Sequence, residues 1–304
     1  MALVSNDSSM AHSVIFSRPL KALYDVPAPA KLNLFLHITG RRADGYHLLQ
    51  SVFMLIDWCD TLHFELRTDG QISRTDLNSP AHGEALPADD LAVRAARALQ
   101  AACGTALGVH IGLEKRIPSQ AGMGGGSSDA ASCLLALQRL WGVRLSSEHL
   151  RALALSLGAD VPFFLSGGHA WVEGIGEKIT PISLPPARFV VVKPAAGVST
   201  QDIFRASDLK RDTANATMQG FTAYATGPIF GFGHNDLQPV AQKMCPQIGQ
   251  SIDWLESQHL QGRMTGSGSA VFAQILHDTD LLAAPGDWNI RKCENLEIHP
   301  LAGW

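Results

Sequence analysis

The sequence predicts an α+β fold with two layers, a sheet and the helices that cover it. Residues 32–38 alternate apolar and polar side chains with the period of a strand. Helical patterns follow capping residues at 89–90 and at 146–148. The strands and helices do not alternate with the regular rhythm of βαβ units, and this favours α+β over a parallel α/β sheet.

The composition limits the class of protein. The chain has 304 residues, of which 46% are hydrophobic and 17% charged, so it can bury a sizeable core and form one or two domains. A net charge of -4 provides no broad basic surface, so we expect no nucleic-acid partner. No apolar run is long enough to predict a membrane span. The five cysteines lie far apart without the spacing of a zinc site, which is typical of the reducing cytoplasm.

The first part of the chain is predicted to form an extension and a domain. Residues 1–24 are polar and mixed and lack the pattern of a signal peptide, so we expect a flexible extension. A first domain then covers 25–184. Its expected elements are strands at 32–38, 48–56, 60–66 and 109–113, helices after 89–90, from the glycine-rich loop to about Leu140 and from 146 to about Gly158, and a hairpin at 167–174.

A second domain is predicted to cover 185–304, beginning at Pro185-Pro186. Residues 206–234 are poorly patterned and predicted to be rich in loops. The other expected elements are an apolar strand at 189–194, a helix cap at 199–202, helices at 236–251 and 252–260, and a glycine turn that leads into a strand at 264–273.

The most informative segment is the glycine-rich run at 118–131, which reads PSQAGMGGGSSDAA. Glycine has no Cβ, so such a loop can adopt positive φ and bring backbone N–H groups close to an anion. The helix that follows presents unpaired N–H groups and the positive end of its dipole. The segment therefore predicts a phosphate-binding site.

Two common phosphate motifs do not fit this loop. The P-loop needs a lysine before its hydroxyl residue, but Gly126 is followed by Ser127 and Ser128. The dinucleotide fingerprint needs a glycine where Ser127 stands. The whole segment resembles the phosphate-binding motif of the GHMP kinase superfamily, and the length of the match favours this over a plain glycine turn with a serine N-cap.

Further segments extend the resemblance from about residue 27 to the C-terminus. Residues 29–36 are followed at 40–47 by Gly-Arg-Arg-Ala-Asp-Gly-Tyr-His, and Thr-Gly-Ser-Gly lies at 265–268. Together with 158–165 and 235–237, they resemble the branch of the superfamily that phosphorylates a cytidine diphosphate-linked methylerythritol. This implies a two-domain GHMP kinase fold with the active site in the cleft between the domains.

The resemblance also implies the reaction. The enzyme would be a kinase that transfers the γ-phosphate of ATP to the tertiary 2-hydroxyl of the methylerythritol moiety, in non-mevalonate isoprenoid precursor biosynthesis. ATP and Mg2+ are the implied cofactors, and a small molecule is the implied partner. We expect a cytoplasmic enzyme that is a monomer or a weak homodimer.

Asp160 is predicted to be the catalytic base. Phosphoryl transfer needs positioning, charge stabilisation and a carboxylate to accept the hydroxyl proton. Asp160 lies among apolar residues, where a carboxylate is costly to bury unless it is paired. Pro162 prevents a helix from continuing through it, so we expect a bend. From these residues alone, a role as a helix N-cap or a turn residue is as well supported as a catalytic role. The resemblance favours catalysis.

The resemblance implies the remaining catalytic and substrate-binding residues. Lys31 would hold Asp160 ionised and steady the transferred charge, although an isolated strand lysine is more often surface charge. Asn33, on the same face, would hold the substrate hydroxyl or the aspartate. Tyr46 and His47 would bind the cytidine end by stacking and hydrogen bonding. Phe204 is either a second stacking ring or an ordinary core aromatic, and Gly266 and Ser267 are the other substrate-binding residues implied.

The resemblance further implies that the glycine-rich loop holds the ATP phosphates. The hydroxyl of Ser128 is expected to contact Mg2+. The expected nucleotide-binding residues are Lys115, Pro118, Gly122, Met123, Gly124, Gly125, Gly126, Ser127, Ser128 and Asp129.

Two residues depart from the family pattern. Asp129 stands where many members have Asn, and Asp90 stands where some have an Asn near the adenine. Two other functions stay open: a GHMP kinase for another small alcohol such as homoserine, and a nucleotide-binding protein without activity. The presence of both Lys31 and Asp160 argues against the second.

Overall fold

The computed structural model describes residues 15–16, 18–78, 86–223, 229–276 and 279–304. The strands are β1 (Ile15–Phe16), β2 (Ala22–Arg41), β3 (His47–Arg67), β4 (Ile72–Asp76), β5 (Gly108–Glu114), β6 (Val143–Arg144), β7 (Ala170–Gly174), β8 (Lys178–Pro181), β9 (Arg188–Lys193), β10 (Arg263–Met264), β11 (Val271–Ile275) and β12 (Asn289–Glu294). The helices are α1 (Leu91–Cys103), α2 (Gly125–Trp141), α3 (Ser147–Leu157), α4 (Val161–Leu165), α5 (Thr200–Arg205), α6 (Met218–Ala223), α7 (Gln238–Met244), α8 (Pro246–Glu256) and the 3-10 helix η2 (Ile229–Gly231).

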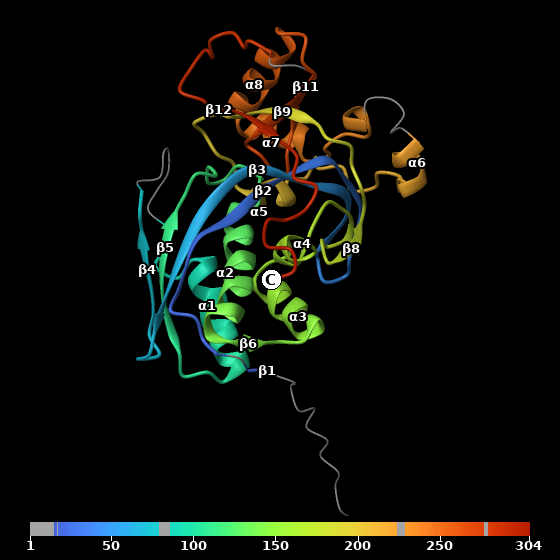
Figure 1. Ribbon diagram of the computed structural model, residues 1–304. Helices are drawn as coiled ribbons and strands as arrows, with labels where there is room; N and C mark the ends of the chain where they lie inside the picture. Colours follow the sequence, from blue (N-terminus) through green and yellow to red (C-terminus); the bar gives the residue numbers. More distant parts are fainter. Residues whose placement is uncertain (1–14, 17, 79–85, 224–228, 277–278) are drawn as a thin grey trace, which may run out of the picture.

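Two sheets form the frame of the molecule, as Figure 1 shows. In the first, the strand order is β4-β5-β3-β7-β8 and β2 pairs with β3; the pairs are antiparallel apart from β4 with β5. Helices α1 and α2 pack on this sheet. The second sheet, β10-β11-β9-β12, is antiparallel and lies beside α7 and α8. The predicted α+β class is confirmed.

Strand β2 is buried on both faces along most of its length. Ala28 belongs to the apolar cluster under α1 and α2, whereas Leu32 and Leu34 belong to a second cluster between the two sheets. The predicted strand at 32–38 is therefore present, but its polar row at Lys31 and Asn33 is buried and not solvated. Burial of that row requires each polar group to find a partner inside the protein.

The predicted strands 48–56 and 60–66 are one continuous strand, β3. The polar residues between them do not interrupt the strand because their carboxylates have backbone partners. Asp57 accepts the N–H of Glu294, and Asp60 accepts the N–H of Arg116 and of Ile117.

Three other boundaries differ from the sequence predictions. The predicted helices 236–251 and 252–260 break instead at Pro246, which lacks an N–H and disfavours helix at the residue before it. The predicted hairpin at 167–174 is formed by β7 and β8 at 170–181. In the predicted extension, residues 15–16 pair with β6 and β2 already begins at Ala22, while 1–14 lie outside the described residues.

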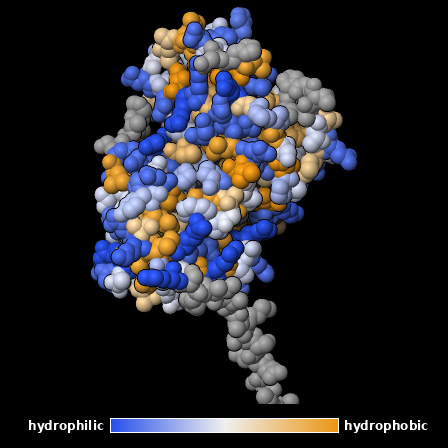
Figure 2. Space-filling model, in the orientation of Figure 1, coloured by the Kyte–Doolittle hydropathy of each residue, from blue (hydrophilic) through white to orange (hydrophobic). Residues whose placement is uncertain are grey.

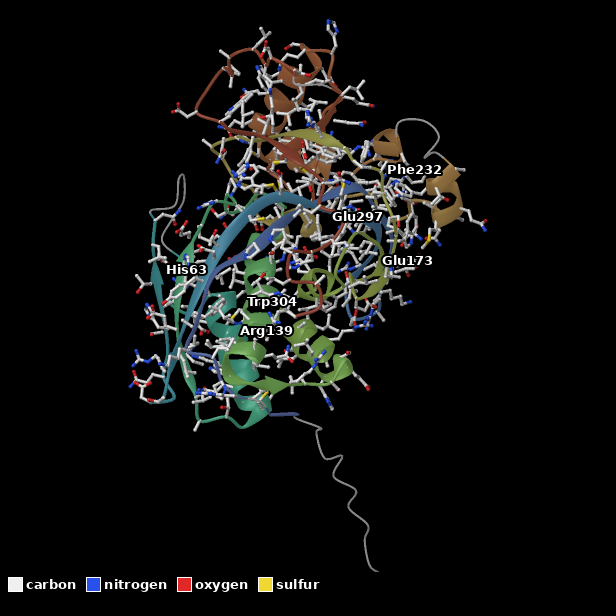
Figure 3. The ribbon with its side chains drawn as sticks, viewed as in Figure 1. His63, Arg139, Glu173, Phe232, Glu297 and Trp304 are labelled. Carbon is white, nitrogen blue, oxygen red and sulfur yellow. The ribbon has the colours of Figure 1, made fainter. Side chains whose placement is uncertain are left out.

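The predicted loop-rich segment 206–234 contains α6 and η2, and residues 224–228 of it lie outside the described part. The predicted domain division at 184/185 falls between β8 and β9. The chain then returns to the first unit after β12. The Leu296 N–H bonds to the carbonyl of Leu55 at 3.0 Å, and the Arg139 guanidinium lies 4.5 Å from the centre of the Trp304 ring (Figure 3).

Figure 2 shows hydrophilic and hydrophobic residues interspersed over one face of the molecule. Among the helices of the described residues, none is both long enough and apolar enough to cross a membrane.

Candidate active site

A cleft of about 1420 Å³ lies between elements of the two predicted domains. Its wall includes the middle and the end of β2, the glycine-rich loop, residues 159–160, helix α5 and the turn at 266–268. The structure brings together every residue that the sequence predicted for the site except Ser128.

The glycine-rich loop leads directly into helix α2. The N-cap is Gly124, in the left-handed region with φ of 72°, so the helix begins inside the glycine run and the N-cap has no side chain to offer. A serine N-cap, the alternative reading of this segment, is therefore wrong. The first N–H groups of an α-helix have no intrahelical acceptor, and here they lie at the cleft, where they can bind an anion.

The loop is fixed to both units by backbone hydrogen bonds. Lys31 on β2 donates its N–H to the carbonyl of Met123 at 3.0 Å. From the second unit, the Ser269 N–H bonds to the carbonyl of Gln120 at 2.9 Å. Gly122 lies so close to the turn that a Cβ built on it would be 2.2 Å from the Thr265 carbonyl oxygen.

Lys31 and Asp160 face each other across the cleft. The Lys31 ammonium lies 3.8 Å from the carboxylate of Asp160, with side chains 4% and 34% exposed respectively. The ammonium also donates to the Gly122 carbonyl at 2.8 Å and to the side-chain oxygen of Asn33. Burial lowers the pKa of Lys31, and the charge of Asp160 opposes that shift. The group is therefore a desolvated cation, which interacts strongly with nearby negative charge.

Asn33 holds this arrangement in place. Its side-chain N–H donates to the Ser51 hydroxyl at 2.9 Å, and its backbone N–H donates to the Thr265 hydroxyl at 2.9 Å. Since the Ser51 hydroxyl donates in turn to a backbone carbonyl of β2, the amide is oriented with its oxygen toward Lys31. Asn33 thus positions the ammonium group.

Asp160 stands at the N-cap position of α4 but does not act as a cap. Its backbone is in the αR region and its side chain accepts no N–H from the helix. Pro162 in the first turn lacks an N–H, which removes one of the donors that a cap would satisfy. The carboxylate is left at the wall of the cleft, beside Lys31.

Lys115 lies beneath the loop in a buried triad with Asp60 and Asp129. Its ammonium bonds to Asp129 at 2.7 Å and to Asp60. Burial opposes the charge of Lys115, but the two carboxylates outweigh burial and raise its pKa. Burial raises the pKa of Asp129 to about 8. The positive charge of Lys115 opposes this shift, and the negative charge of Asp60 adds to it. Asp60 also accepts two backbone N–H groups, whereas Oδ1 of Asp129 has no hydrogen-bond partner within the described residues, so Asp129 is the one that keeps its proton at neutral pH.

Tyr46, His47 and Phe204 meet at the opposite end of the cleft. The His47 and Phe204 rings lie 4.9 Å apart with an angle of 32° between their planes. Tyr46 is 61% exposed and lines the same cavity. Phe204 is partly buried against an apolar cluster that includes Val192, Ile203 and Leu237, and it also lines the cleft, so its position is compatible with both of the roles that the sequence left open. The arrangement offers two aromatic faces and an imidazole to a planar ring.

Ser128 does not lie where the magnesium prediction needs it. Its side chain is fully buried, and its hydroxyl has no hydrogen-bond partner within the described residues. One residue along an α-helix is a rotation of about 100°, which turns Ser128 toward the core while Ser127 lines the cleft. We therefore do not propose Ser128 as a metal ligand.

Asp90 is committed to a structural role. Its carboxylate caps α1 by accepting the Val93 N–H at 3.0 Å, and it pairs with Arg74 at 2.8 Å. An Asn at this position would cap the helix equally well, so what the Asp adds is the charge of the ion pair.

Three arginines at the cleft were not predicted as site residues: Arg41, Arg94 and Arg205. A single arginine in a loop or on a helix surface looks the same in a sequence as a solvated charge. For Arg41 a signal existed, since it belongs to the Gly-Arg-Arg-Ala-Asp-Gly-Tyr-His run. For Thr200, whose hydroxyl lies 2.6 Å from that of Ser267, the signal is the Thr-x-x-Ile stretch that precedes Phe204.

Two family models match the chain. The GHMP kinases N terminal domain matches residues 90–168, and the GHMP kinases C terminal domain matches residues 227–284. The glycine-rich loop lies in the first match and the turn at 265–270 in the second. The fold and the site thus define a GHMP kinase.

Relatives and a solved structure narrow this class. The 4-diphosphocytidyl-2-C-methyl-D-erythritol kinase of Polaromonas naphthalenivorans is 84% identical, over 97% of this chain and 100% of the relative. The enzyme of the same name from Polaromonas sp. strain JS666 is 77% identical, over 99% and 100%. A crystal structure of 4-(cytidine 5'-diphospho)-2C-methyl-D-erythritol kinase is similar with a TM-score of 0.68 and 34% identity, over 84% of this chain and 90% of that one. The chain belongs to the 4-diphosphocytidyl-2-C-methyl-D-erythritol kinase family.

The contact at Gly122 yields a first prediction. Gly122→Ala should lose ATP affinity and destabilise the protein by more than Gly104→Ala. Both glycines have positive φ, which costs an alanine about 1 kcal/mol, but a Cβ at Gly104 meets nothing within 4 Å. Only Gly122→Ala therefore adds an overlap with backbone. Thermal unfolding and ATP titration measure both effects, and equal losses in the two variants would contradict the proposed close contact.

The buried triad yields a second prediction. An unfolded aspartate releases its proton near pH 3.8, whereas folded Asp129 keeps its proton to about pH 8. The folded state thus binds the extra proton between these values, and the free energy of unfolding falls as pH rises through them. Asp129→Asn cannot titrate, so its free energy of unfolding should increase relative to the wild type between about pH 5 and about pH 8. Urea unfolding at several pH values measures this difference.

The matched change across the lysine serves as the contrast. Asp60→Asn should reduce the pH dependence between about pH 5 and about pH 8, because the charge of Asp60 helps to raise the pKa of Asp129, which can then ionise beside Lys115. Parallel pH profiles for the wild type and Asp129→Asn would show that Asp129 does not hold the proton.

Proposed function

We propose that the protein transfers the γ-phosphate of ATP to the 2-hydroxyl of 4-diphosphocytidyl-2-C-methyl-D-erythritol, a step of the non-mevalonate route to isoprenoid precursors. The observation that carries this proposal is the placement of the Lys31–Asp160 pair in one cleft, with a phosphate loop and an aromatic site for a pyrimidine. The kinship with enzymes that have this name supports the same substrate.

The donor end of the reaction follows from the loop. The ATP phosphates would bind at the N-terminus of α2, where backbone N–H groups and the helix dipole favour negative charge. Lys115 lies 3.4 Å from where a Cβ of Gly125 would be, so its fixed positive charge also lies under the phosphates. The loop is held from both sides, so it would bind the γ-phosphate without rearrangement.

The acceptor end follows from Asp160 and Lys31. Asp160 would accept the proton of the 2-hydroxyl as its oxygen attacks the γ-phosphorus. Lys31 would stabilise the charge on the phosphoryl oxygens, and it does so in a desolvated setting where electrostatic interactions are strong. Asn33 would keep the ammonium in position through its own hydrogen bonds.

We also propose that Mg2+ enters with ATP. Within the described residues, no three His, Cys, Asp or Glu side chains are grouped to hold a metal ion. Mg2+ commonly binds through substrate phosphates, waters and one or two protein oxygens, so the cleft fits an ion carried by the nucleotide. Ser127 would offer such an oxygen, and the bound ion would neutralise charge on the β- and γ-phosphates.

We also propose that the enzyme is cytoplasmic. All five cysteines are free, and this is typical of a reducing compartment. A monomer or a weak homodimer stays the prediction for its oligomeric state, which sedimentation would measure.

Asp160→Asn should lower kcat by about a hundredfold or more, because the variant loses its proton acceptor. ATP affinity should change little, since Asp160 makes no contact with the loop beyond Lys31. ADP release with 4-diphosphocytidyl-2-C-methyl-D-erythritol measures kcat, and ATP titration measures binding. Near-normal turnover would remove Asp160 as the base, and no turnover by the wild-type enzyme would reject the proposed reaction.

Tyr46→Ala should raise the KM for this substrate by about tenfold while kcat stays similar, because a lost stacking contact costs about 1–3 kcal/mol. This variant separates the proposed substrate from a small alcohol such as homoserine, which has no ring to stack. Steady-state kinetics with both compounds gives the comparison. An unchanged KM in Tyr46→Ala, with turnover of homoserine by the wild-type enzyme, would favour the smaller acceptor.

A further inference from the structure

Arg211 lies behind the aromatic end of the cleft and contacts the ring of His47 and the backbone of Phe204. Its Nε donates a hydrogen bond to Nε2 of His47 at 3.0 Å. One of its terminal nitrogens donates to the carbonyl of Phe204 at 3.1 Å and to that of Ala206 at 2.7 Å. The other terminal nitrogen donates to the carbonyl of Leu209 at 2.9 Å. Arg211 itself is not among the residues that line the cleft.

These bonds fix the protonation of His47. A guanidinium has only donors and stays charged in proteins, so the nitrogen that faces it must be an acceptor. Nε2 of His47 is therefore unprotonated, and the proton of the neutral imidazole is on Nδ1. Burial, followed by the charges of Arg211 and Arg41, lowers the pKa of His47 and agrees with a neutral ring.

The same guanidinium fixes the His47 ring and the backbone segment that carries Phe204. Arg211 binds the carbonyl of Phe204, near the end of α5, and the ring of His47, at the start of β3. The two rings lie 4.9 Å apart. Four hydrogen bonds from one side chain leave little freedom for rotation of the imidazole. His47 therefore presents one hydrogen-bond donor, Nδ1–H, in a fixed position, and it cannot change its tautomer.

A fixed single donor distinguishes the two common pyrimidines. Cytosine has an acceptor at N3, whereas uracil has a donor there. We propose that Arg211 is a positioning residue that sets the specificity of the site for cytosine over uracil, because it holds His47 as the Nδ1–H tautomer. This inference rests on the proposed function, since it assumes that the aromatic end binds the cytidine part of the substrate. An imidazole free to exchange its proton would accept from uracil as readily as it donates to cytosine.

The test compares CDP and UDP as competitive inhibitors of the full-length enzyme. In Arg211→Gln, the inhibition constant of CDP should rise about tenfold, as expected for loss of one oriented hydrogen bond, while that of UDP changes less than about twofold. The kcat and the KM for ATP should also stay within about twofold, because Arg211 does not contact the phosphate loop. Lys210→Gln removes a positive charge from the exposed neighbouring position and should leave both inhibition constants unchanged.

The protonation of His47 is measured independently by 15N NMR, with its signals assigned through His47→Gln. The wild-type enzyme should show the proton on Nδ1, and Arg211→Gln should show a mixture of tautomers. A proton on Nε2 in the wild type would overturn the proposal even if the variant failed to fold. Arg211→Lys, which keeps the charge and one donor, should have an intermediate preference for CDP.

The outcomes separate this inference from the proposed function. Equal weakening of CDP and UDP in Arg211→Gln would mean that Arg211 only holds the loop, and it would overturn the proposal. Unchanged selectivity, together with normal turnover of the cytidine substrate, would reject the inference and leave the proposed function intact. A wild-type enzyme without turnover that binds CDP no better than UDP would reject both.

Discussion

The direct contact between the backbone of the glycine-rich loop and the backbone of the turn at 265–270 is the constraint on which the site depends. No side chain fits between Gly122 and Thr265, and hydrogen bonds continue the contact on either side. The loop is joined to β2 in the same way, through Met123. The parts of the cleft proposed for ATP and for the alcohol thus meet at one rigid backbone contact. The distance between them is set by backbone geometry.

Two lysines in the cleft have opposite electrostatic settings. Lys115 has two buried carboxylates, so its charge is permanent and its position is set by the fold. Lys31 is more deeply buried but has one carboxylate at 3.8 Å, and burial lowers its pKa. The charge of Lys115 is therefore already compensated and constant, whereas the charge of Lys31 is only partly compensated and can interact with additional negative charge. That difference suits a site in which charge moves during the reaction.

The sequence allowed the class of the fold to be predicted, and nearly all of the site residues that it predicted lie at the cleft, because short motifs mark the loop and its neighbours. It did not allow prediction of where polar strand residues point. Asp57 and Asp60 looked like a break between strands, since their backbone partners come from distant segments. Ser128 could not be distinguished from Ser127 without the start of α2, and Arg211 lay in a segment without pattern. Long-range partners decide these cases, and periodicity does not report them.

The apolar cluster between the two sheets has a consequence for how the molecule comes apart. Leu32 and Met54 from the first sheet pack in one core with Val191 and Phe272 from the second. Separating the halves would expose that core on both sides at once, at a cost of about 25 cal/mol for each Å². Despite its two family regions, the chain should melt in a single cooperative transition, and neither half would survive as an autonomous folding unit.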